Sequence, residues 1–242
     1  MSSADKVYDH IVIGSGFGGS VSAMRLAEKG YDVLVLEKGK RWKPEELPRS
    51  NWNIRKYLWA PLLRCFGPQR IDILNRIMVL SGTGVGGGSL IYANTHMMPG
   101  PAFFEHPAWA RFGDWRARLA PHYATARFML GSTRYEKEGP EDAVLHEIAR
   151  VMGRADTYKP VDHVGVHLGD PHTATDPYFK GLGPERRGCI ECANCMVGCR
   201  HNAKNTLDRN YLWFAERYGA RIEAETEVER IWHRVTGIGG QQ

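Results

Sequence analysis

The sequence lacks any long apolar run. No uninterrupted apolar stretch approaches the roughly 18 residues that a membrane-spanning helix needs, which excludes a transmembrane role. Residues 1–6 are polar and contain no apolar secretion signal, so we expect a cytoplasmic protein. Internal repeats and low-complexity tracts are also absent.

Blocks of like charge are missing as well. The 32 Lys and Arg and the 27 Asp and Glu give a net charge of +5, and the basic residues are dispersed. One local basic cluster stands out, formed by Arg186, Arg187, Arg200, His201 and Lys204. This distribution is typical of a solvated surface and argues against nucleic acid binding.

Cysteine is scarce outside one segment. Cys65 is expected to be a small buried apolar residue. The other four, Cys189, Cys192, Cys195 and Cys199, follow the spacing C-x2-C-x2-C-x3-C, which in ferredoxins holds iron–sulfur clusters. However, Arg200 stands where a proline often follows, and there is no second cysteine set. An iron–sulfur cluster, a zinc ion and packed or redox-active thiols therefore remain alternatives.

An apolar strand followed by G-x-G-x-x-G opens the sequence at residues 8–19. Gly14 permits a tight turn, Gly16 lets the backbone approach a pyrophosphate, and Gly19 lets the next helix pack closely on the strand. A helical apolar stripe, a terminating Gly30 and a second strand over residues 32–36 complete the unit. Glu37 ends that strand, where an acid can accept hydrogen bonds from an adenosine ribose. The pattern predicts a dinucleotide site.

A second glycine-rich segment covers residues 79–94, V-L-S-G-T-G-V-G-G-G-S-L-I-Y-A-N. Glycine carries an entropic cost in regular elements, so the segment indicates a loop that approaches a flat ligand closely. Helical patterns follow over residues 115–130, 141–152 and 207–218, and a strand-like pattern covers residues 220–232. Residues 41–68 have no clear period and are expected to be irregular.

Both glycine motifs and the stretch CMVGCRHNAKNTLDRNYL resemble those of the glucose-methanol-choline (GMC) flavoprotein oxidoreductases, nearest to the cholesterol-oxidase-like members. The resemblance implies an α/β fold: a Rossmann-like FAD-binding domain with an inserted, incomplete α+β substrate domain. The expected parts are residues 1–98 and 187–235 for the FAD-binding domain, 99–186 for the substrate domain, and 236–242 as a tail or truncation point. Family chains are about twice as long, so we expect an N-terminal part of a longer chain.

The resemblance also implies a cofactor site for FAD. The residues expected to line it are Gly14, Gly16, Gly19, Glu37, Gly84, Gly86, Gly87, Gly88, Ser89, Asn94 and, through its backbone, Val228. Better-known cholesterol oxidases read G-G-G-S-L-V-N-G-G at the second loop, whereas here Asn94 comes two positions later. That departure puts cholesterol itself in question as the substrate.

The resemblance predicts oxidation of the CH–OH group of a bulky, apolar, sterol-like alcohol, with hydride passing to the flavin and then to O₂ or a redox partner. The family's catalytic residues lie late in its chains, so none is assigned here, although His96, His106, His122, His163, His167, His172 and His201 are present. The alternative is a non-catalytic fragment that binds FAD or an iron–sulfur cluster. An NAD-dependent enzyme would leave the second glycine loop without a purpose.

Overall fold

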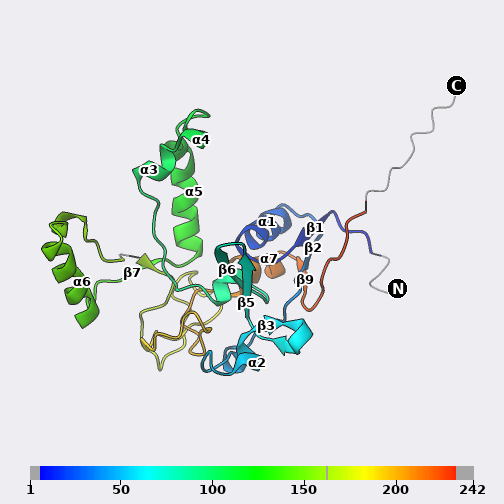
Figure 1. The fold of residues 1–242 in the computed structure, drawn as a ribbon. Coiled ribbons are helices and arrows are strands. Elements are labelled where there is room, and N and C mark those ends of the chain that lie inside the picture. Colours follow the sequence, from blue (N-terminus) through cyan, green and yellow to red (C-terminus); the bar gives the residue numbers. More distant parts are fainter. Residues whose placement is uncertain (1–5, 162, 233–242) are drawn as a thin grey trace.

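The computed structural model describes residues 6–161 and 163–232. They form a mixed α/β fold arranged around one small parallel sheet, as Figure 1 shows. The predicted α/β class with a Rossmann-like unit is confirmed by the strand and helix order at the N-terminal end. Among the described residues, no helix combines the length and apolar character needed to cross a membrane.

Three parallel strands make up this sheet. β1 (His10–Ile13) and β9 (Arg221–Glu223) flank β2 (Val33–Leu36). β2 is the central strand because all four of its residues are aliphatic, which suits a strand covered on both faces. Leu34 pairs with Ile11 on one side and with Arg221 on the other, so residues from both ends of the described chain meet in one sheet.

Two helices pack on this sheet and against each other, α1 (Phe17–Glu28) and α7 (Tyr211–Arg217). Small side chains allow the close approach, and Gly30, with a φ of 86°, follows the end of α1 as expected. The buried core between helices and sheet includes Ala23, Ala27, Val33, Val35, Leu212 and Ala215.

An antiparallel hairpin that no pattern in the sequence predicts leads into the second glycine loop. It pairs β5 (Gln69–Leu74) with β6 (Ile77–Gly82). Asn75 begins the two-residue connection with a φ of 53°, a conformation that asparagine tolerates. β6 starts with four consecutive exposed apolar residues, so the alternation that usually reveals a strand is absent.

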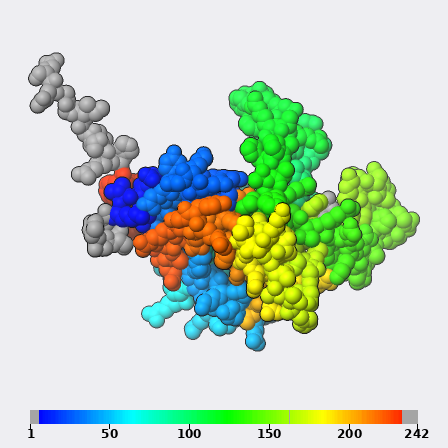
Figure 2. All heavy atoms as spheres, turned by 180° about the vertical axis from the view of Figure 1, so that it is seen from behind, coloured from blue at the N-terminus to red at the C-terminus, as the bar shows by residue number. Residues whose placement is uncertain are grey.

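Two helical projections occupy the middle of the chain. α5 (Trp115–Met129) carries α3 (Pro101–Phe104) and α4 (Pro107–Ala110) at its outer end, and α6 (Pro140–Val151) stands apart. Figure 1 shows both leaving the body, and Figure 2 shows them from behind as separate lobes. The strands β7 (Thr133–Arg134) and β8 (His163–Val164) pair near the base of α5.

Residues 41–68 contain only short elements, in agreement with the predicted irregular structure. These are η2 (Pro44–Glu46), α2 (Ile54–Tyr57), β3 (Trp59–Ala60), η3 (Pro61–Leu63) and β4 (Cys65–Phe66). Cys65 is buried, as expected for a small apolar residue.

Two sequence expectations near the C-terminal end need correction. The predicted helix over residues 207–218 is split into η6 (Leu207–Arg209) and α7, because Asn210 has a φ of −143° and a ψ of −95°, outside the helical region. The predicted strand over residues 220–232 is reduced to the three residues of β9. The helices expected over residues 115–130 and 141–152 are confirmed to within one residue at each end.

Gly19→Ala is expected to lower the free energy of unfolding by about 1–3 kcal/mol, the usual cost of overpacking. An added Cβ would lie 1.9 Å from the carbonyl oxygen of Gly14, where α1 meets β1. Gly18→Ala is the matched control, because its Cβ would meet nothing within 4 Å and alanine favours a helix by up to about 1 kcal/mol. Denaturant unfolding followed by circular dichroism compares them. Equal loss of stability in both variants would contradict the close contact.

Candidate functional site

The first glycine motif leaves the N-terminus of α1 open. Gly14 adopts a φ of 85°, and Gly16 is the N-cap of α1 with no side-chain hydrogen bond to the first helical N–H groups. A Cβ at Gly14 or Gly16 would meet no atom within 4 Å, and the first turn holds no acidic residue. Uncapped N–H groups and the positive end of the helix dipole suit an anion. This arrangement fits a pyrophosphate.

Glu37 is a buried carboxylate that accepts four hydrogen bonds. Its side chain receives the backbone N–H and hydroxyl of Ser15 at 3.0 and 2.7 Å, and the N–H groups of Gly39 and Gly84 at 2.9 and 3.3 Å. Only 5% of Glu37 is exposed. A carboxylate has about four acceptor positions, so all of them are occupied by protein donors. A ribose bound here must replace some of these donors.

The second glycine loop lies directly on the first. The N–H of Gly86 donates to the Ser15 hydroxyl at 3.0 Å, and a Cβ at Gly87 would lie 2.7 Å from the Cα of Gly16. Gly86 and Gly87 both have positive φ. Buried Ser89 donates to the carbonyl of Gly86 and accepts from the N–H of Leu207, which fastens the loop to η6. The structure thus brings both predicted glycine motifs together at one edge of the sheet.

Asn94 lies away from this junction of the glycine loops. The Asn94 side chain donates to the sulfur of Cys195 at 2.9 Å, so it faces the cysteine segment. Val228 is half-buried in the segment after β9. Thr226, two residues before Val228, donates its N–H to the carbonyl of Glu37 at 2.9 Å. The segment after β9 therefore runs beside Glu37, where the adenosine is predicted to bind.

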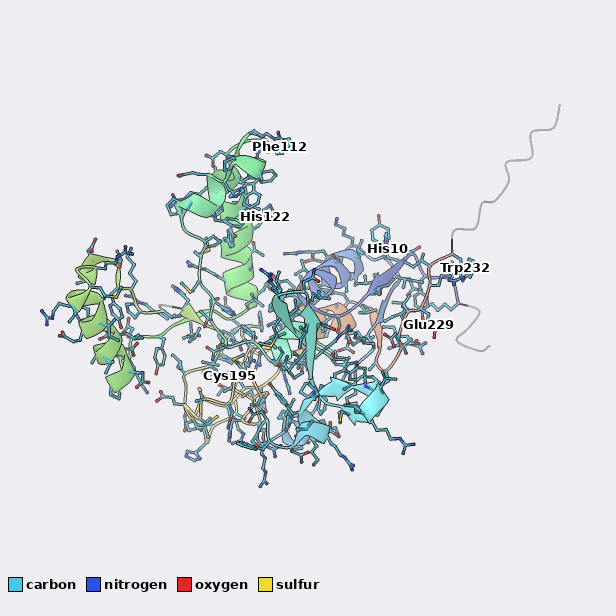
Figure 3. The ribbon with its side chains drawn as sticks, viewed as in Figure 1. His10, Phe112, His122, Cys195, Glu229 and Trp232 are labelled. Carbon is cyan, nitrogen blue, oxygen red and sulfur yellow. The ribbon has the colours of Figure 1, made fainter. Side chains whose placement is uncertain are left out.

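The cysteine segment forms a thiol-lined cavity of about 230 Å³. Among the residues that the structure describes, no group of three or more His, Cys, Asp or Glu could hold a metal ion. An iron–sulfur or zinc site at Cys189, Cys192, Cys195 and Cys199, one of the alternatives that the sequence leaves open, is therefore not supported. Figure 3 labels Cys195 in this region of loops.

The thiols of the cysteine segment have distinct surroundings. Cys192 is exposed, whereas Cys195 is partly buried and accepts the hydrogen bond from Asn94. Burial raises the pKa of the Cys189 and Cys195 thiols. All the cysteines among the described residues are free thiols.

Two members of the basic cluster are buried, which the sequence did not indicate. Arg186 donates to the backbone carbonyls of Lys204 and Arg209. Lys204 donates to the carbonyls of Leu90 and Cys195 at 3.1 and 2.8 Å and lies 4.5 Å from the centre of the Tyr92 ring. Burial lowers the pKa of Lys204 to about 7. The amine therefore links the second glycine loop to the cysteine segment.

A histidine at the base of α5 has partners on both ring nitrogens. His96 Nε2 lies 3.0 Å from the Tyr92 hydroxyl, and His96 Nδ1 lies 2.6 Å from the Ser132 hydroxyl. Burial lowers the pKa of His96. Tyr92 and Ser132 were not singled out from the sequence. The spacing of four residues between Tyr92 and His96 is the only local signal, since Ser132 comes from a distant segment.

Glu37→Gln is expected to lower the free energy of unfolding by about 2–3 kcal/mol, since its amide would turn a donor toward backbone N–H groups that now bond to a charged acceptor. Glu28→Gln is the control: Glu28 is exposed and pairs with Arg25, and surface pairs contribute about 0–1 kcal/mol. Denaturant unfolding measures both, and an equal effect of the two substitutions would refute the role given to Glu37.

Stability should rise between pH 7 and about pH 8.5 because of Lys204. The unfolded chain keeps the lysine proton up to its ordinary pKa of 10.5, whereas the folded chain releases it near pH 7. The unfolded state then binds more protons, and the free energy of unfolding increases by up to about 1.4 kcal/mol per pH unit. Above pH of about 8.5, Cys189 and Cys195 lower the free energy of unfolding as the pH rises. Their raised pKa values mean that the folded chain keeps thiol protons that the unfolded chain has released.

Denaturant unfolding at pH 7.0 and 8.5 tests this dependence on Lys204. Lys204→Met should remove the rise, and Lys29→Met, at an exposed position after α1, should keep it. A rise that survives in the Lys204→Met variant would assign the dependence to another group.

Sequence comparisons match the chain to oxidases and an oxidoreductase. Residues 12–42 match the NAD(P)-binding Rossmann-like domain family. A cholesterol oxidase of Mycobacterium tuberculosis is 49% identical over 237 residues, 96% of this chain and 41% of that protein. A GMC-type oxidoreductase of the same species is 32% identical over 93% of this chain and 32% of that protein. A long-chain-alcohol oxidase of Arabidopsis thaliana is 28% identical over 94% of this chain and 28% of that protein.

A solved structure with a similar fold is pyridoxine 4-oxidase from Mesorbium loti. It matches with a TM-score of 0.53 and 17% identity, over 90% of this chain and 42% of that chain. This likeness concerns the fold alone. The chain spans about two fifths of the length of the cholesterol oxidase it matches. With its Rossmann unit and paired glycine loops, the chain is similar to a GMC-type oxidoreductase and, more strongly, to a cholesterol oxidase.

Proposed function

We propose that the chain forms an FAD site and contributes to oxidation of the CH–OH group of an apolar, sterol-like alcohol. The observation that supports this most is the uncapped N-terminus of α1, with open space at Gly14 and Gly16, beside the second glycine loop. The similarity to a cholesterol oxidase and a long-chain-alcohol oxidase favours an alcohol substrate.

In the proposed complex, backbone groups between Gly14 and Gly19 bind the pyrophosphate. Glu37 and the segment around Val228 hold the adenosine end, and residues 84–89 hold the flavin end. A bound flavin supplies the hydride acceptor for alcohol oxidation, and O₂ or a redox partner then takes the electrons. The chain's own contribution is to bind and orient the cofactor and to exclude water from the junction of the two glycine loops.

Gly16→Ala tests the cofactor site. Gly16 has a φ of −69°, which alanine adopts without strain, and its Cβ would project into open space. We expect a loss of stability of at most about 1 kcal/mol, because alanine is a poorer N-cap than glycine, and at least about tenfold weaker FAD binding, because the methyl group fills the space for the pyrophosphate. Gly100→Ala is the control, at another helix N-cap with open space around it.

Titration of the purified chain with FAD, followed by flavin absorbance and fluorescence, measures this affinity. Equal FAD affinity in both variants, or tighter binding of NAD than of FAD, would contradict the proposed cofactor site.

Anaerobic addition of a sterol alcohol to the FAD-loaded chain tests the reaction. Bleaching of the flavin bands is expected if the chain supports oxidation. Persistent bands would favour the second candidate, a non-catalytic FAD-binding fragment. That candidate is supported by the chain spanning about two fifths of the cholesterol oxidase.

A further inference from the structure

The cysteine segment, residues 189–199, has no part in the proposed function. Its four thiols line the cavity of about 230 Å³, and they are those of Cys189, Cys192, Cys195 and Cys199. None of them is in a disulfide. Cys65 is the contrasting case, a free thiol that is only 4% exposed. Buried thiols of that kind fill space and are inert, whereas thiols that border a cavity are open to a reagent.

Cys192 is the accessible thiol of the segment. It is exposed, whereas the other three are partly buried. A thiol reacts with a dissolved compound only where that compound can reach its sulfur. A small reagent that enters the cavity therefore reacts first with Cys192.

Cys195 is the thiol best placed to react with Cys192 afterwards. The two have the spacing of C-x-x-C redox motifs, and the chain bends between them at Ala193, which has a φ of 57°. The chain runs without a bend from Cys189 to Cys192. Among the described residues, no helix or strand lies between β8 and η6. The segment can therefore adjust to the Cα separation of about 4.4–6.8 Å that a disulfide requires.

Cys195, labelled in Figure 3, also connects the segment to the second glycine loop. Its sulfur accepts a hydrogen bond from the side-chain amide of Asn94 at 2.9 Å, and its carbonyl accepts one from the amine of Lys204 at 2.8 Å. The same amine donates to the carbonyl of Leu90 at 3.1 Å. A new covalent bond at this sulfur would compete with the Asn94 contact, while Lys204 would still hold the backbone.

We propose that Cys192 and Cys195 form a thiol–disulfide exchange site that accepts small organic disulfides, RS–SR. This inference goes beyond the proposed function and does not depend on it. In the first step the Cys192 thiolate attacks one sulfur of the reagent. A bond between Cys192 and SR forms, the RS–SR bond breaks, and RS⁻ leaves and takes up a proton.

The second step closes the protein disulfide. The Cys195 thiolate attacks the sulfur of Cys192, the Cys192–Cys195 bond forms, the bond to SR breaks, and the second RS⁻ leaves and takes up a proton. The two protein thiols are oxidised by two electrons, and the reagent is reduced to two molecules of RSH.

The test uses the 242-residue chain without flavin and glutathione disulfide as the probe, at about pH 8, where thiolates are more abundant than at pH 7. Remaining thiols are then blocked with N-ethylmaleimide. Cleavage after Glu191 and at Met196 releases residues 192–196, which hold no other cysteines than Cys192 and Cys195. We expect mass spectrometry to find this peptide unblocked and lighter than its dithiol form by two hydrogen atoms.

Variants separate the two steps. Cys195→Ser should stop the reaction after the first step, so that glutathione stays on Cys192. Cys192→Ser should leave the other thiols of the segment unmodified. Cys199→Ser is the matched control, because it removes a different thiol from the same cavity and should leave formation of the Cys192–Cys195 bond unchanged.

A bond from Cys192 to Cys189 or Cys199 would overturn the proposal, as would a chain in which N-ethylmaleimide still blocks all four thiols after exposure to the probe. The same treatment in guanidinium chloride gives the pairing of the unfolded chain. An identical mixture of pairs in the folded chain would show that the fold does not select Cys192 and Cys195, and the proposal would fail.

Discussion

One buried carboxylate, that of Glu37, holds the two glycine loops against the parallel sheet. Glu37 directly follows β2, and its oxygens bind the first glycine motif through Ser15 and the second through Gly84. Such bonds to a charged acceptor are stronger than neutral ones. The positions of both loops relative to the sheet therefore depend on a single side chain, and the same acid is the one that a ribose would need to engage.

Contact of backbone with backbone is the second constraint. Gly19 touches Gly14, Gly39 touches Gly84, and Gly87 touches Gly16 at distances that leave no room for a Cβ. The surface that remains around Gly14 and Gly16 is made of main-chain N–H groups with open space in front of them. Recognition at such a surface depends on shape and on the helix dipole more than on side-chain identity.

The predictable parts of the structure are those encoded by short-range patterns. The strand–helix–strand unit, the helices α5 and α6 and the end of α7 follow from periodicity and from glycine positions. The bond between Asn94 and Cys195 joins residues 101 positions apart, and no local pattern encodes it. The cysteine spacing left three alternatives open for the same reason: spacing shows which ligands are near in sequence, whereas the directions of their side chains are set by tertiary contacts.

The central strand has a consequence for the order of assembly. β2 pairs with β1, its neighbour in sequence, but its other partner is β9, with Leu34 opposite Arg221. Pairing across so much chain carries a large loop-closure cost and forms slowly. During synthesis the first glycine motif can fold early. The hydrogen bond from the N–H of Glu37 to the carbonyl of Glu223 can form only after β9 has been synthesised. The junction of the glycine loops is therefore begun by residues near position 14 and completed only after residues 221–223 have been synthesised.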